Sequence, residues 1–259
     1  MKNCCYLLPI IFVISCAVPK QLVQKYKPLT LNAVALYMPK PTSFDSVKTK
    51  NYISGGIYQL LQTNYSGKSN LQDVVLMGDL AYNRAHIYDK FNFAYGFNAF
   101  MGSYKNNFIQ ADDPNYFKTK SVGGFQLKTS VNTFHKFKNC DFRFIGVDLA
   151  YMNESGEYKD FRNEIKKREY FYAITTSSFF TAGLNSEVVF KNSLGKNSQL
   201  GIKLSLLKSF GNFDYDGVDF SGGKNDGFAT VISLYAKKNC FFMVLEGGDS
   251  GKLNLGFTF

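Results

Sequence analysis

The sequence predicts an all-β protein, an antiparallel transmembrane β-barrel of about ten strands. Three observations lead to this prediction. From about residue 51 onward apolar side chains recur at every second position, the intervening positions are small or polar, and long polar connections alternate with short ones. Successive side chains of a strand point to opposite faces, so each segment has one apolar and one polar face. In a membrane barrel these faces meet hydrocarbon and lumen.

The composition excludes several classes of protein. The chain has 259 residues, of which 45% are hydrophobic and 17% aromatic, a length that allows one large domain or two small ones. Its 26 Phe and 17 Tyr supply too much buriable surface for a disordered chain. The longest apolar run lies at the N-terminus and is too short to span a bilayer as a helix. The net charge of +10 is scattered along the chain, so no nucleic-acid partner is predicted.

Residues 1–15 are predicted to be a signal peptide. A basic start at Lys2 and an apolar stretch over residues 6–14 precede a small residue, Ser15, which is the order of a secretory signal. The stretch Val13-Ile14-Ser15-Cys16 resembles the lipobox of bacterial lipoproteins. This resemblance implies that Cys16 becomes the first residue and carries a covalent diacylglycerol with fatty acyl chains such as palmitate. A buried apolar first strand is the alternative.

Residues 16–50 are predicted to form an extended, lipidated tether. This region has no clear period and holds four of the six prolines, which favour extended chain: Pro19, Pro28, Pro39 and Pro41. The triplet Asp45-Ser46-Val47 resembles an O-glycosylation acceptor of Bacteroidota, with an ordinary solvated turn as the alternative.

Residues 51–259 are predicted to form the barrel. The clearest alternation runs from Phe91 to Gly102. The expected strands cover about 51–63, 71–83, 90–103, 121–133, 141–152, 170–182, 198–210, 227–237, 240–247 and 252–259. Eight strands are the alternative, because Glu187 to Phe190 could extend a strand or form a turn element. A soluble sandwich would also alternate. Gly, Asn, Lys and Asp in the middle of long strands suit a wet or hydrogen-bonded lumen, with lipid against the other face, and so favour the barrel.

The polar face is predicted to line the lumen. Its central members are Asn98, Gln126, Lys128, Asp148 and Lys203. Side chains just fill a barrel of about eight strands, whereas wide aqueous pores need roughly sixteen. We therefore expect opposed acids and amines to pair and fill the interior, and a narrow solute pore is the alternative.

The last strand is predicted to carry a barrel-assembly signal. Apolar residues alternate at its outward positions, Leu253, Leu255, Phe257 and Phe259. This pattern resembles the C-terminal signature of bacterial outer-membrane barrels, which implies the barrel insertion machinery as a partner. A soluble edge strand that happens to end in Phe is the alternative.

Taken together, the chain resembles small lipidated outer-membrane β-barrel proteins of Bacteroidota. The residues that carry the resemblance are Val13 to Cys16, the alternating segments of 51–259 and Phe257-Thr258-Phe259. Membership would imply residence in the cell outer membrane among its lipids. Surface-exported lipoproteins of this phylum resemble each other in an acidic stretch after the lipidated cysteine, and Ala17 to Gln21 contains no acid. We therefore expect the lipid anchor and the tether on the periplasmic side.

No catalytic set, metal site or cofactor is predicted. A general base must lie within hydrogen-bond reach of its nucleophile, and both histidines, His86 and His135, fall in expected periplasmic connections. The acidic run Asp214, Asp216 and Asp219 lacks the closing Glu of a calcium loop. Cys140 and Cys240 are expected to be unpaired, with a single disulfide as the alternative.

The predicted function is a structural or accessory role in a larger outer-membrane complex. The positive mark for this role is a tether long enough to reach a partner. A narrow passive solute channel is the alternative, and an outer-membrane lipid hydrolase is the third hypothesis.

Overall fold

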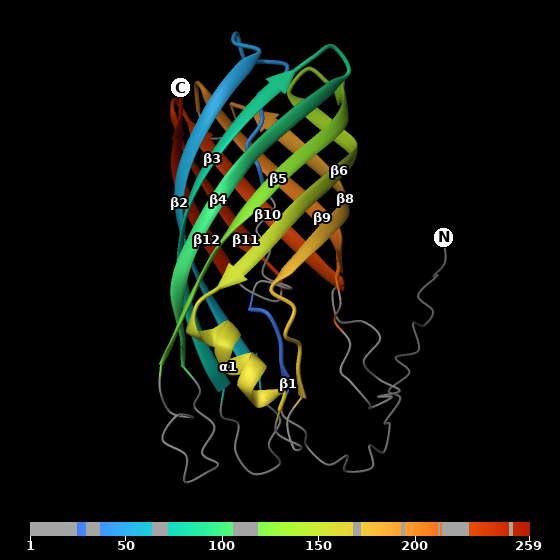
Figure 1. Ribbon diagram of the computed structural model, residues 1–259. Helices are drawn as coiled ribbons and strands as arrows, with labels where there is room; N and C mark the ends of the chain where they lie inside the picture. The colour runs from blue at the N-terminus through green and yellow to red at the C-terminus, as the bar shows by residue number, and fades with distance from the viewer. Residues whose placement is uncertain are drawn as a thin grey trace, which may run out of the picture.

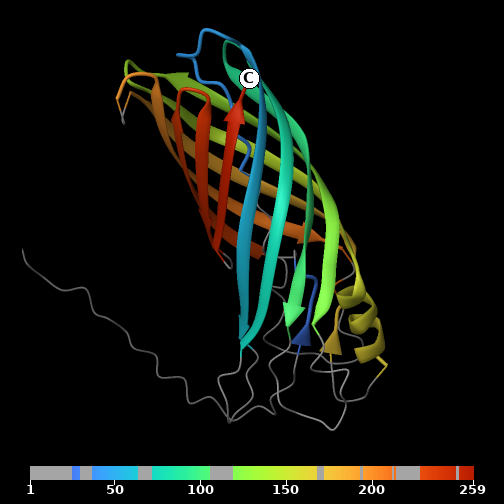
Figure 2. The ribbon, with the colours of Figure 1, turned by 90° about the vertical axis from the view of Figure 1, so that its left-hand side faces the viewer.

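Ten strands close into one antiparallel barrel in the computed structural model (Figures 1 and 2). The structure describes residues 25–29, 37–63, 72–105, 119–167, 172–192, 195–211, 213, 228–248 and 251–259. Around the barrel the strands follow the order β10-β11-β12-β2-β3-β4-β5-β6-β8-β9, so each pairs with its neighbour in the chain and β12 closes on β2. The predicted fold class and strand number are confirmed.

The barrel strands have the following bounds: β2 (Thr49–Thr63), β3 (Gln72–Ile87), β4 (Phe91–Lys105), β5 (Lys120–Lys136), β6 (Cys140–Ser155), β8 (Ser178–Lys191), β9 (Ser198–Phe210), β10 (Phe228–Lys238), β11 (Phe241–Gly247) and β12 (Gly251–Thr258). Outside the barrel, β1 (Lys25–Tyr26) pairs in parallel with β7 (Tyr172–Ala173), close to helix α1 (Glu157–Ile165). None of the described helices is long and apolar enough to cross a membrane.

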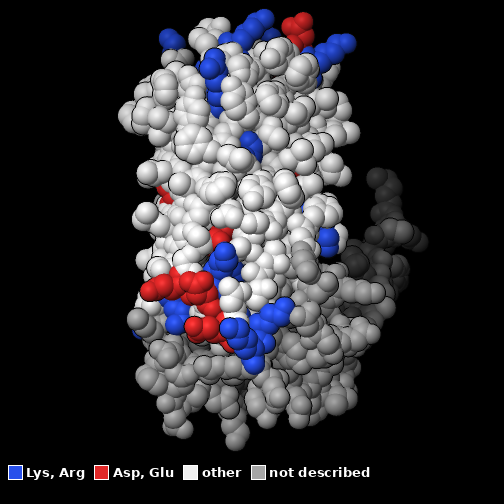
Figure 3. All heavy atoms as spheres, viewed as in Figure 1, with Lys and Arg blue, Asp and Glu red and all other residues white. Residues whose placement is uncertain are grey.

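The outer wall of the barrel is apolar. Side chains at its outward positions are large and well exposed, for example Ile57 (65%), Leu80 (69%) and Met101 (75%). Figure 3 shows the wall as a largely uncharged band below a rim of Lys and Arg side chains. Barrel closure leaves no strand edge unpaired, which is what a sheet in hydrocarbon requires. The wall therefore faces lipid, and the chain is a transmembrane barrel of the outer-membrane type.

The two ends of the barrel differ. At one end, here called the short-turn end, lie the turns 88–90, 137–139, 192–197 and 239–240, the start of β2 and the end of β12. The opposite, long-connection end carries the connections 106–119, 156–177 and 211–227, together with α1, β1 and β7. Long connections of outer-membrane barrels face outward and short turns face the periplasm.

The region around residues 153–182 differs from its prediction. The expected strand over 170–182 and the loop before it are instead α1, β7 and a later strand, β8. The helix forms because Tyr158, Phe161 and Ile165 recur at helical spacing and are buried in an apolar cluster at the long-connection end. Glu187 to Phe190 belong to β8, which resolves the ambiguity in favour of ten strands.

The N-terminal region also differs from its prediction. Tyr37, Met38, Lys40 and Thr42 are buried inside the barrel, with exposed fractions of 6% or less. They are enclosed because the lumen of ten strands is wider than the lining side chains alone would fill. Residues 37–45, here called the lumen segment, are therefore not part of a free tether. The segment reaches the short-turn end, where β2 begins at Thr49.

Candidate functional site: the lumen and its N-terminal segment

The lumen segment is held at its centre by a buried ion pair of the barrel wall. Arg143 of β6 and Glu187 of β8 face each other on the inner surface, with Arg143 Nη1 2.6 Å from Glu187 Oε2. The Tyr37 hydroxyl donates a hydrogen bond of 2.7 Å to Glu187 Oε1, and Arg143 Nη2 donates one of 3.0 Å to the Pro41 carbonyl. Hydrogen bonds to charged groups are the stronger ones in proteins. The ion pair thus binds the stretch from Tyr37 to Pro41 at both of its ends.

Further polar contacts fix the same stretch to four other strands. The Tyr37 amide donates to Glu246 Oε1 of β11 (3.1 Å), and Lys40 Nζ donates to Asn132 Oδ1 of β5 (2.6 Å). Gln199 of β9 donates to Thr42 Oγ1 (3.1 Å). The Tyr37 ring stacks on Tyr235 of β10, with ring centroids 5.4 Å apart. Because these contacts come from strands around the barrel, the segment occupies the lumen rather than one side of it.

A second group of contacts holds the end of the lumen segment at the rim of the short-turn end. The amide and hydroxyl of Ser43 donate to the Asp141 carboxylate at 2.6 and 2.5 Å. Asp45 accepts hydrogen bonds from the Thr42 amide (2.7 Å) and from Lys50. Burial raises the pKa of the Asp45 carboxyl, but the hydrogen bonds from Lys50 and Thr42 and the nearby charge of Lys237 outweigh it, and the pKa falls to about 2. We call residues 42–45 with Asp141 and Lys50 the rim latch.

The five residues predicted for the lumen all lie on its inner face and are buried: Asn98, Gln126, Lys128, Asp148 and Lys203. Lys203 and Asp148 form an ion pair of 2.6 Å. Asn98 donates to Asp79 (2.7 Å), a carboxylate that Lys252 also contacts. Gln126 Nε2 and Asp148 Oδ1 are buried without a hydrogen-bond partner among the described residues. Buried polar atoms of this kind are normally satisfied by water.

Several residues of the site were not among those predicted. Arg143 and Glu187 occupy inner positions between outward residues such as Phe142 and Phe144, so the two-residue alternation could have revealed them. Tyr37 and Lys40 lie in a stretch without periodicity, and no sequence signal marks them as lumenal.

The side chains of the predicted assembly signal point outward. Leu253, Leu255, Phe257 and Phe259 are exposed on the outer wall. The backbone of Phe259 exchanges two hydrogen bonds with Asn51, of 3.0 and 3.1 Å, which completes the seam between β12 and β2. The role of these four outward side chains in barrel assembly stays a prediction.

The two histidines lie near the short-turn end, in β3 and β5. His86 Nδ1 is 2.9 Å from Thr49 Oγ1, and its ring stacks on Tyr95. The His135 ring contacts Phe137 edge-on. Among the described residues no group of three or more His, Cys, Asp or Glu could hold a metal ion. Cys140 and Cys240 are both free thiols.

Other sequence predictions fall on residues that are not described. The signal peptide 1–15, the lipidation site Cys16 and the acidic run Asp214, Asp216 and Asp219 lie outside the described residues. Ser46 is described and lies exposed in the bend that leads from the lumen segment to β2.

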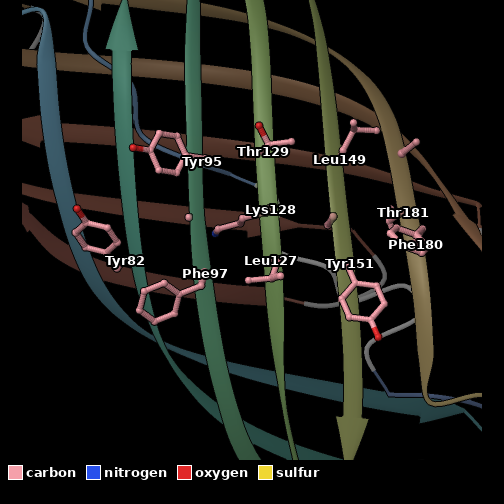
Figure 4. A pocket seen from close by; sticks show the side chains of 13 residues that line it. Tyr82, Tyr95, Phe97, Leu127, Lys128, Thr129, Leu149, Tyr151, Phe180 and Thr181 are labelled. Carbon is pink, nitrogen blue, oxygen red and sulfur yellow. The ribbon is translucent and has the colours of Figure 1, made fainter.

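A hollow of about 550 Å³ indents the outer wall across β4, β5, β6 and β8 (Figure 4). One row of cross-strand partners borders it: Phe97, Leu127, Tyr151 and Phe180. The next row contains the small side chains Thr129 and Ala182 between larger neighbours. The alternation of large and small outward residues therefore creates the hollow.

The strands form a closed ring, the outer wall is apolar, and the lumen is polar and filled. These features define an outer-membrane β-barrel with an internal N-terminal segment. The sequence matches no protein-family model and no curated protein.

Solved structures of outer-membrane barrels are similar. An outer membrane channel of Pseudomonas putida F1 is 10% identical with a TM-score of 0.40, over 84% of this chain and 98% of that one. The translocator domain of the autotransporter NalP from Neisseria meningitidis is 12% identical with a TM-score of 0.42, over 81% and 88%. A mutant of the TodX monoaromatic hydrocarbon channel is 10% identical with a TM-score of 0.34, over 91% and 72%.

Proposed function

We propose that this chain is a narrow outer-membrane channel for small polar solutes, closed by its own lumen segment. The observation that carries the proposal is the polar character of the contact between segment and wall. Tyr37, Lys40 and Ser43 are held by charged and amide groups, and unpartnered polar atoms remain beside them on the wall. Water can replace such partners when the segment moves, which it cannot do for an apolar core.

The width of the barrel supports the same proposal. Ten strands enclose more space than their own side chains fill, and the segment takes up the difference. Displacing it would leave a path lined by both signs of charge, including Lys128, Lys203, Asp148 and Glu246. A mixed lining favours neither cations nor anions strongly.

Conductance in planar bilayers tests the channel. We expect wild-type protein to be closed most of the time and the double variant Tyr37→Ser/Lys40→Ser to conduct in discrete steps. These substitutions shorten the segment's side chains and leave every wall residue in place. Val47→Ser is the matched control, because Val47 is exposed outside the lumen. Resistance of the folded band to SDS before boiling checks that each variant still forms a barrel.

A folded double variant that carries no more current than wild type would reject the channel. The structural or accessory role in a larger outer-membrane complex would then be the function to test. The wall hollow favours that second candidate, because a partner side chain can pack over the small side chains Thr129 and Ala182. Filling it with Ala182→Phe should remove a partner recovered by mild-detergent pull-down, whereas Leu184→Phe, also on the outer wall, should not.

Two partners belong to the proposal as well. The outward apolar residues of β12 support recognition by the barrel insertion machinery, and the lipobox-like sequence before Ala17 supports a covalent diacylglycerol at Cys16. Metabolic labelling with palmitate, compared between wild type and Cys16→Ser, tests the lipid.

A further inference from the structure

The chain is held at both ends of the barrel before its first barrel strand begins. Residues 25–29 lie at the long-connection end, beside α1 and β7 (Figures 1 and 2). Residues 42–48 lie at the short-turn end, where the Ile87 amide donates to the Lys48 carbonyl (2.9 Å). Between them, the buried positions 37–42 are inside the lumen.

The long-connection end grips residues 25–29 through a set of specific contacts, here called the outer clasp. β1 pairs with β7, and the Ile174 amide continues this pairing to the Tyr26 carbonyl at 2.9 Å. Tyr158 of α1 donates to the Lys27 carbonyl (2.9 Å), and the Leu29 amide donates to Glu154 Oε2 (3.0 Å). The segment at this end is therefore bound through its backbone.

A buried ion pair supports the outer clasp. Arg162 of α1 lies 2.6 Å from Glu154 Oε1 of β6, and both side chains are fully buried. The same arginine donates to the Ile174 carbonyl (2.9 Å), while the Tyr26 ring packs edge-on against Phe161, with centroids 5.3 Å apart. One carboxylate thus binds α1 with one oxygen and residue 29 with the other.

From this arrangement we infer that the chain crosses the membrane an eleventh time, inside its own barrel, and presents its N-terminal residues on the outer side of the cell. The orientation follows from the long connections, which face outward in such barrels. Unpaired backbone cannot return through hydrocarbon, and the lumen is already occupied. Whatever precedes Lys25, the expected lipid on Cys16 included, therefore belongs to the outer face, opposite to the side expected from the sequence.

Cysteine labelling on intact cells tests this topology with two positions of one segment. In a chain with Cys140→Ser and Cys240→Ser, Lys27→Cys and Ser46→Cys are compared with a membrane-impermeant maleimide. Lys27→Cys should react on intact cells, as should Lys167→Cys, an exposed position after α1. Ser46→Cys should react only after the outer membrane is permeabilised. The chain without an added cysteine gives the background.

Reaction of both positions on the same side, or Ser46→Cys alone on intact cells, would overturn the inference. An epitope inserted between Gln24 and Lys25 gives a second readout that does not depend on one side chain. We expect antibody to bind it on intact cells, and binding only after permeabilisation would contradict the proposed crossing. The result is independent of conductance, so the channel proposal and this topology can fail separately.

Discussion

At the scale of single residues, charged side chains of the barrel bind the chain that precedes β2, in the lumen and at both of its ends. Arg143 and Glu187 bind it in the lumen, Glu154 binds it at the outer clasp, and Asp141 binds it at the rim. Arg143 and Glu187 also pair with each other, and Glu154 also pairs with Arg162 of α1. A buried ion pair gains stability only when its remaining hydrogen-bonding groups are satisfied. The segment supplies several of these partners, so wall and segment stabilise each other.

The rim latch should depend on pH in a defined direction. The pKa of Asp45 is lowered from an ordinary value of 3.8 to about 2, so its carboxylate stabilises the fold above about pH 4. This contribution is lost as the pH falls toward 2. We expect the unfolding free energies of wild type and Asp45→Asn to differ by a constant amount from pH 5 to 7 and to converge toward pH 2. Denaturant titrations in detergent measure both.

A difference that disappeared already at pH 4 would show that Asp45 is not stabilised in this way. Ser46→Ala serves as the control, because its side chain is exposed and should change the unfolding free energy at no pH.

Sequence reasoning located some of these residues and missed others for a physical reason. Asn98 and Asp148 lie in strands, where the alternation assigns every residue to a face. Tyr37 and Lys40 lie in extended chain whose side chains meet the wall on all sides, and such chain has no periodic pattern. Their partners come from strands 92 to 209 residues away in the chain, which no local signal can indicate.

At the scale of elements, glycines allow the inner face to accommodate its polar side chains. Gly96 of β4 points inward, and a Cβ there would overlap the Tyr82 carbonyl oxygen and the Asn83 side chain. Gly78 of the adjacent strand β3 points outward, and a Cβ there would have its nearest neighbour at 3.7 Å. The two glycines therefore have different reasons to be present.

Alanine substitutions at these two positions should therefore differ in their effect on the unfolding free energy. Gly96→Ala should lower the unfolding free energy by about 1–3 kcal/mol, because backbone atoms cannot move away easily. Gly78→Ala should change it by less than about 0.5 kcal/mol, because the added methyl group meets no close neighbour. Denaturant titrations in detergent measure both free energies. Equal loss in both variants would mean that inner crowding is not the cause.

The boundaries of most strands could be predicted, whereas α1 could not. The middle parts of strands such as β4 and β9 alternate between outward apolar and inward small or polar residues. The residues of α1 are mostly charged, and its buried Tyr158, Phe161 and Ile165 become an apolar face only because Tyr26 and Tyr104 cover them. A helix whose apolar face is covered by residues far away in the sequence gives a weak local signal.

At the scale of the whole molecule, the apolar wall determines where the protein resides. An arginine in the middle of a lipid-facing wall costs about 2–4 kcal/mol, and near the interface about 0–1 kcal/mol. Leu80 lies in the interior of β3, and Tyr88 lies in the turn after it. Leu80→Arg should therefore lower stability in bilayers by the larger amount and Tyr88→Arg by the smaller. Urea unfolding in lipid vesicles measures both, and equal effects would contradict a membrane-spanning wall.

Closure around an internal segment constrains how the molecule is made. A closed barrel has no opening between its strands, and the N-terminal chain is bound at both ends of the lumen. Curling the sheet around a segment that is already seated requires no threading of a chain end through a narrow bore. The pairing of Asn51 with Phe259 would then be the last step of assembly. The N-terminal residues would have to cross the membrane before β12 pairs with β2.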